Sequence, residues 1–114
     1  MHRLALGLAL AASCRAATEH APCGSVALRF ETVARGELES ATIDPSLRAD
    51  VLAELPAMRD SLAGLCRDGA WPAAVRDCMA RAQTRAAIET CESALGDAPR
   101  AALDRVMHRE TGPR

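Results

Sequence analysis

Apolar side chains recur every three or four positions along most of this chain, which is the spacing of one face of an α-helix. The longest apolar stripe begins after Asp44 and Pro45, a pair typical of a helix N-cap and first turn. Pro56 lies inside the stripe, so we expect a kink there or two shorter helices that meet at Pro56. The stripe consists of Leu47, Val51, Leu55, Met58, Leu62 and Leu65.

The segment before this stripe allows two interpretations. Pro22 at its start and Gly36 near its end favour a helix over residues 22–37. The alternative is a strand over residues 26–30, because Val26, Leu28 and Phe30 alternate with other residues. We favour the helix, whose apolar face would consist of Cys23, Val26, Phe30, Val33 and Leu38.

Three shorter helices are predicted after Gly69, which breaks the long stripe. The first opens at Trp71-Pro72 and runs to about Ala82. Thr84 is the expected N-cap of the second, which ends at Gly96. The third starts at Asp97 and Pro99. Their inward positions would be Val75, Cys78, Met79 and Ala82, then Ile88, Cys91 and Leu95, then Leu103, Val106 and Met107.

The composition agrees with an all-α fold. Trp71 and Phe30 are the only aromatic residues, so the core must be built mostly from Ala, Leu, Val and Met. Alanine is the best helix former, whereas strands favour β-branched and aromatic side chains. We therefore expect a small antiparallel bundle of about five short helices over residues 22–109, followed by a frayed tail at 110–114.

The N-terminus has the three parts of a secretory signal. Arg3 provides a positive start, residues 4–12 form an apolar run, and small residues follow. The apolar run is too short for a transmembrane helix, which needs about 20 residues. A buried N-terminal helix is the alternative, but its terminal position and the flanking Arg3 favour a signal peptide over residues 1–13.

The segment Leu10-Ala11-Ala12-Ser13-Cys14 resembles the lipobox of bacterial lipoproteins, although Ala11 stands where that family usually has a larger aliphatic residue. The resemblance implies that Cys14 is acylated and becomes the first residue of the mature protein. Residues 14–21 would then be a tether, and Arg15 after the cysteine implies an outer-membrane destination. Cleavage by an ordinary signal peptidase would also fall here, which would leave a protein secreted without an anchor.

The other four cysteines, in an exported domain, indicate two structural disulfides. Four cysteines permit three pairings. In a helical hairpin, paired residues lie at equal distances from the turn. The midpoint of Cys23 and Cys66 falls beside the Asp44 turn, and that of Cys78 and Cys91 beside Thr84. These two pairings are therefore favoured.

The stretch from Cys66 to Leu103, with its Cys-Trp-Cys-Cys order, resembles a helical Cys module of uncharacterised putative lipoproteins from myxobacteria-like organisms. The resemblance covers about a third of the chain. It implies a helical fold and no particular activity.

Charge gives no indication of a nucleic-acid partner. All 14 basic residues are Arg, against 15 acidic residues, and they form no basic stripe of the kind that binds nucleic acid. Along the long stripe Arg48, Arg59 and Arg67 alternate with carboxylates, which predicts a solvated face of i,i+4 ion pairs rather than an acidic site.

The sequence lacks the usual catalytic and metal-binding motifs, so we expect no enzyme activity, cofactor or metal. Of the three histidines, His2 belongs to the signal, His20 to the tether and His108 to the end of the last helix. Three methionines fit apolar stripes better than a copper site. Trp71 is expected to pack at the start of its helix.

Two hypotheses about function follow. The first is an exported, lipid-anchored envelope protein, at the outer membrane or in the periplasm, whose helical surface binds a protein partner, with exposed arginines as the candidate contacts. The alternative is a periplasmic small-ligand or metal-binding protein that uses Trp71 and His108.

Overall fold

The computed structural model describes residues 19–107, and this part of the chain is all α-helical. The predictions for Cys14, His108 and the segments 1–13 and 110–114 lie outside the described residues. The helices are α1 (Cys23–Ser40), α2 (Pro45–Asp68), α3 (Ala73–Arg81), α4 (Arg85–Glu92) and α5 (Asp97–Met107).

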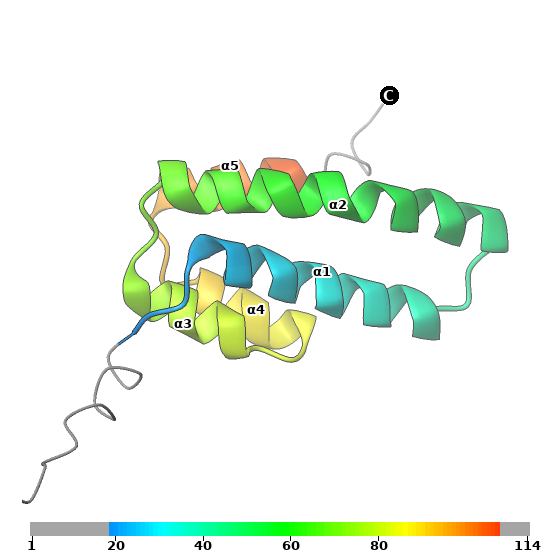
Figure 1. Ribbon diagram of the computed structural model, residues 1–114, viewed down its shortest axis with the longest axis horizontal. Coiled ribbons are helices and arrows are strands. Elements are labelled where there is room, and N and C mark those ends of the chain that lie inside the picture. Colours follow the sequence, from blue (N-terminus) through cyan, green and yellow to red (C-terminus); the bar gives the residue numbers. More distant parts are fainter. Residues whose placement is uncertain (1–18, 108–114) are drawn as a thin grey trace, which may run out of the picture.

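The helices α1 and α2 form a long antiparallel hairpin (Figure 1). Helix α1 excludes the alternative of a strand over residues 26–30, and Gly36 does not end it. The chain stays helical to Ser40, whose hydroxyl donates to the Gly36 carbonyl over 3.1 Å. Asp44 caps α2 as expected, because its carboxylate accepts from the backbone N–H of Ser46.

Helix α2 is one continuous element rather than two helices that meet at Pro56. Proline cannot donate a backbone hydrogen bond. Pro56 lies on the exposed side of α2, next to the buried Leu55. Packing against α1 before and after this position accounts for the continuity, since buried apolar area outweighs one lost hydrogen bond.

The turn after α2 depends on Gly69 for space rather than for a left-handed backbone. The left-handed residue is Ala70, with φ of 46°. A Cβ on Gly69 would lie 2.9 Å from the Leu65 carbonyl oxygen and 3.2 Å from the Trp71 ring. The backbone N–H of Trp71 then donates to the Cys66 carbonyl over 3.1 Å. Gly69 is thus required mainly by the close approach of the Leu65 carbonyl, with the indole as a second close neighbour.

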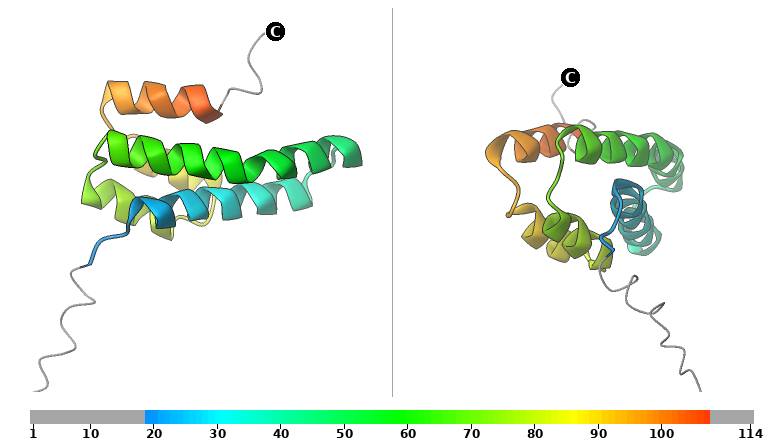
Figure 2. Two further views of the ribbon diagram at one scale, coloured as in Figure 1. Left: turned by 45° about the horizontal axis from the view of Figure 1, so that its top comes forward. Right: turned by 60° about the vertical axis from the view of Figure 1, so that its left-hand side comes forward.

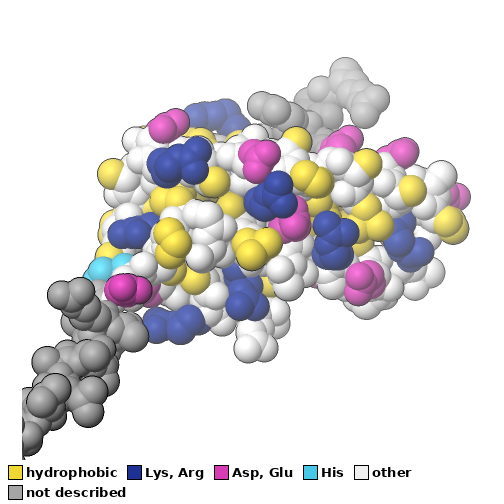
Figure 3. Space-filling view, viewed as in Figure 1, with side chains coloured by type: hydrophobic (Ala, Val, Ile, Leu, Met, Phe, Trp, Pro, Cys, Tyr) yellow, Lys and Arg dark blue, Asp and Glu magenta, His cyan; other side chains and the backbone are white. Residues whose placement is uncertain are grey.

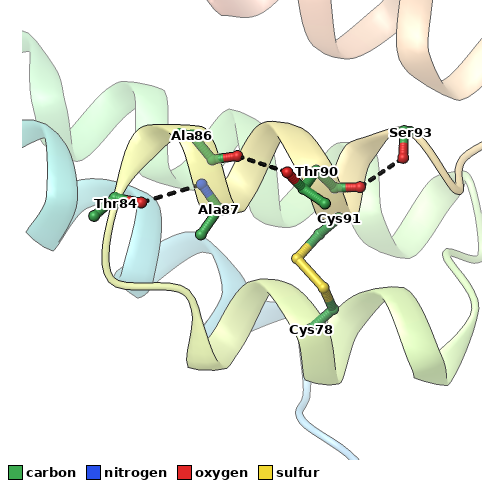
Figure 4. Close-up of a disulfide and its surroundings, with 7 residues drawn as sticks. All are labelled: Cys78, Thr84, Ala86, Ala87, Thr90, Cys91 and Ser93. Atoms are coloured by element: carbon green, nitrogen blue, oxygen red, sulfur yellow. Dashed lines mark hydrogen bonds between the residues drawn. A yellow bond between two sulfur atoms is a disulfide. The ribbon is translucent and has the colours of Figure 1, made fainter.

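The helices α3 and α4 form a second, shorter hairpin (Figure 4). Pro72 is the N-cap position, so α3 begins at Ala73. The Thr84 hydroxyl accepts from the backbone N–H of Ala87 over 3.1 Å, as expected for an N-cap. Helix α4 stops at Glu92, before Gly96, because the following residues form tighter turns that still bury Leu95.

One core holds the two hairpins and α5 together. Helix α3 packs on α1, and α5 packs on α2, as the two views in Figure 2 show. The expected all-α antiparallel bundle with two disulfides is confirmed. Among residues 19–107, no helix has both the length and the apolar character needed to cross a bilayer. The largest buried cluster comprises Val26, Ala27, Phe30, Leu62, Cys66, Trp71, Val75, Met79, Ala82, Ile88, Cys91, Leu95 and Leu103, and Leu55 is buried outside it.

The α1–α2 hairpin extends beyond the other three helices (Figures 1 and 2). The core cluster and the side chains packed on it reach Val33 on α1 and Met58 on α2, and they go no further toward the hairpin turn. We call residues 34–57, which lie beyond these two positions, the arm. It is not wholly separate from the domain, because Leu55 is buried and Glu37 pairs with Arg85 of α4 over 3.0 Å. Leu47 on the arm is 52% exposed.

Candidate functional site

Two disulfides fix the ends of the hairpins. Cys23 is bonded to Cys66, with a Cα–Cα distance of 5.6 Å, and Cys78 to Cys91, with 5.7 Å. Both pairings are those that the equal-distance argument favoured. Disulfides persist in oxidising surroundings and are rare in the reducing cytosol. They therefore indicate an extracellular or periplasmic environment.

The residues that lead into α1 are held against α3. The Asp77 carboxylate accepts from the Ala21 backbone N–H and contacts Nδ1 of His20, both over 2.7 Å. Arg76 donates to the Ala21 carbonyl over 2.7 Å and to the Trp71 carbonyl over 3.1 Å. Although the sequence placed His20 and Ala21 in a tether, they lie on the domain. We call Asp77 and Arg76 the clasp.

The clasp makes the stability of the domain depend on pH. Hydrogen bonds from Ala21 and then His20 lower the pKa of Asp77 below its ordinary value of 3.8, because they favour the carboxylate. Because the pKa of Asp77 is lower in the folded than in the unfolded protein, its carboxylate stabilises the fold fully above pH 3.8. This stabilisation is lost as the pH falls through the folded-state pKa.

We expect Asp77→Asn to lower the melting temperature near neutral pH. The difference from the unmodified protein should shrink as pH falls through the lowered pKa of Asp77, because below that pKa both proteins carry a neutral side chain. Thermal unfolding followed by circular dichroism across this range measures it. Asp50→Asn on the exposed face of α2 is the matched control. A difference that stays constant with pH would exclude the clasp as its source.

An apolar hollow of about 300 Å³ lies where α2 ends and α5 begins. Trp71 forms part of its wall and is only 4% exposed, so the indole is mainly a core side chain. This burial agrees with the expected structural role of Trp71. The hollow is lined by Leu65, Asp68, Gly69, Trp71, Ala98, Pro99 and Ala102.

A second hollow, of about 250 Å³, lies between α1, α4 and α5. Its lining is mixed: four apolar side chains lie beside one basic and three acidic ones, namely Phe30, Val33, Ile88, Met107, Arg85, Glu89, Glu92 and Asp104. Within residues 19–107, no cluster of three or more His, Cys, Asp or Glu side chains has the arrangement of a metal site. Met79 is fully buried, and Met58 and Met107 pack against the core, which agrees with their assignment to apolar stripes.

Most of the well-placed arginines have structural partners. Arg48 donates to the Leu38 and Ala41 carbonyls, over 3.0 and 2.7 Å, and so fixes the turn of the arm. Arg59 reaches across to Glu31 on α1 over 3.2 Å. The expected i,i+4 pairs along α2 are thus replaced, at these two positions, by contacts between helices. Arginines held in this way are poor candidates for partner contacts.

Comparison with known proteins adds no relative: no family, curated protein or solved structure matches this chain.

Proposed function

We propose that this protein is exported, is anchored to an envelope membrane through a lipid on Cys14, and acts by binding another protein. The arm is the observation that carries the proposal. It extends from a domain that two disulfides hold rigid, and it presents apolar side chains that the core leaves uncovered.

The apolar stripe of α2 continues into the arm. Leu47 is 52% exposed, and Val51, one turn later on the same face, is half-buried. An apolar stripe normally faces a packed neighbour. Leu38 on α1 is also half-buried, so both helices of the arm offer apolar surface to a partner.

Charge indicates which partner would fit. The arm carries five carboxylates and two arginines. Of the two, Arg48 is bound to backbone carbonyls and Arg35 lies 4.0 Å from Glu31. On the face shown in Figure 3, acidic side chains lie around the projecting end, with apolar and a few basic side chains between them. We therefore propose a partner surface that is apolar and basic, since complementary charge guides association. The carboxylates are those of Glu37, Glu39, Asp44, Asp50 and Glu54. Glu37 pairs with Arg85 of α4 and Asp44 caps α2, which leaves Glu39, Asp50 and Glu54 as the candidate contacts of a basic partner.

A photo-cross-linking residue at position 47, in the native host, tests the arm. The matched control is position 28, because Leu28 on α1 is 54% exposed but lies outside the arm. We expect a discrete cross-linked protein from position 47 and none from position 28. Replacement of Glu39 and Asp50 by Lys should weaken that product, because the new charges repel a basic surface. Equal products from both positions, or no product from position 47, would contradict the proposal.

A further inference from the structure

The end of the domain nearest Cys14 is identified by chain length. Glu19, where the described structure starts, is five residues after Cys14. An extended chain spans at most about 3.6 Å per residue, so these two residues are no more than about 18 Å apart. The Cys23–Cys66 disulfide then joins the start of α1 to the last turn of α2. We call this end of the bundle the base.

The base carries the apolar hollow lined by Trp71. Leu65 of the hollow precedes the disulfide-bonded Cys66 in the chain, and Ala98 and Pro99 come from the first turn of α5. Figure 1 shows the starts of α1, α3 and α5 and the end of α2 together at this end of the molecule. The hollow is therefore on the side of the domain that a lipid anchor would hold closest to the bilayer.

We infer that the base docks on the lipid bilayer, with the hollow against the boundary between headgroups and acyl chains. This inference rests on the proposed acylation of Cys14. A shallow apolar surface fits that boundary, and the Trp71 indole, only 4% exposed, forms the inner wall of the hollow rather than a membrane anchor of its own. The domain would then contact the bilayer at two points, the lipid on Cys14 and the hollow. Two contacts restrict how the domain can tilt on the membrane.

Charge favours the base over the arm as the docking end. The exposed acids Glu19, Asp68 and Asp97 at the base are nearly balanced by Arg67 and Arg100. The arm has an excess of carboxylates, which anionic lipids repel. Helix α2 has 24 residues and connects the two ends. At 1.5 Å per residue it carries the tip of the arm about 36 Å from the base, away from the membrane.

Trp71 is the only tryptophan and gives a direct measurement. The acylated full-length protein is reconstituted in phosphatidylcholine vesicles whose acyl chains carry bromine near the headgroup. Bromine quenches indole fluorescence on close approach, so we expect Trp71 to be quenched relative to vesicles of unbrominated lipid. Because the docking is apolar, the quenching should change little with salt.

Two substitutions on α5 provide the matched comparison. Ala98→Glu places a charge at the exposed edge of the hollow, and an acidic residue in the first turn suits the helix dipole, so the fold should persist. Ala101→Glu places the same charge on the same helix outside the hollow. We expect Ala98→Glu to lose most of the quenching while it stays vesicle-bound, and Ala101→Glu to keep it.

The outcomes separate docking from anchoring. If the wild-type protein is acylated and bound to vesicles but its Trp71 fluorescence is not quenched, docking is wrong and anchoring stands. If the protein lacks the added mass of acyl groups and does not bind vesicles, the proposed anchor is wrong instead. The unacylated Cys14→Ser protein is also mixed with a dispersed brominated fatty acid. If Trp71 is then quenched as strongly as in the vesicle experiment, the hollow is a pocket for single acyl chains and bilayer docking is wrong.

Discussion

Replacing both Cys23 and Cys66 by alanine is expected to lower the free energy of unfolding by about 4 kcal/mol. The disulfide closes a loop with a sequence separation of 43, so its loss returns much conformational entropy to the unfolded chain. Small domains have only about 5–15 kcal/mol of stability in total. The variant should therefore unfold at far lower urea concentrations than the unmodified protein, as measured by circular dichroism.

The second disulfide provides the internal control. Cys78 and Cys91 close a loop with a separation of 13, so their replacement by alanine should cost less, about 3 kcal/mol. Each variant loses one buried cysteine, Cys66 in the first and Cys91 in the second, so their packing losses are similar and the difference reports loop length. If the short-loop variant proves the less stable of the two, loop closure is not the main contribution of these bonds.

Replacing Cys14 by serine is expected to move the protein from the membrane fraction to the soluble fraction. A lipid chain contributes about 0.8 kcal/mol for each buried CH₂ group, and a serine at position 14 offers no thiol to acylate. Fractionation of host cells followed by immunoblotting measures the change. The apolar hollow at the base is too small a contact to hold the domain on the bilayer alone.

The matched control for this variant is Ser13→Ala, which keeps a small residue before the cysteine. This control should remain in the membrane fraction. A Cys14→Ser protein that also remains there, and that resists extraction by alkaline carbonate, would mean that something other than a lipid on Cys14 retains it.

Local signals in the sequence predicted much of the fold. Asp44 and Thr84 act through hydrogen bonds to residues two and three positions away, so their capping roles are visible in the sequence. The disulfide pairing follows from hairpin symmetry once the turns are placed. Burial of Trp71 was also expected, because it directly precedes the start of a helix.

Other features depend on contacts that no local pattern reveals. Gly36 lowers helix propensity, yet α1 continues to Ser40, and beyond Gly36 Arg48 of α2 donates to the Leu38 carbonyl over 3.0 Å. The bond between Ala21 and Asp77 joins residues 56 positions apart. The hollow at the base forms only when α5 folds onto α2. Tertiary contacts of this kind decide where the base and the arm lie.

The most direct test of the central proposal is the intact mass of the protein purified from its native host, before and after reduction. We expect a membrane-bound species that starts at Cys14, carries the added mass of acyl groups, and gains two hydrogens for each of the two disulfides on reduction. A soluble species that retains Met1 and has free thiols would contradict export, anchoring and the disulfides together.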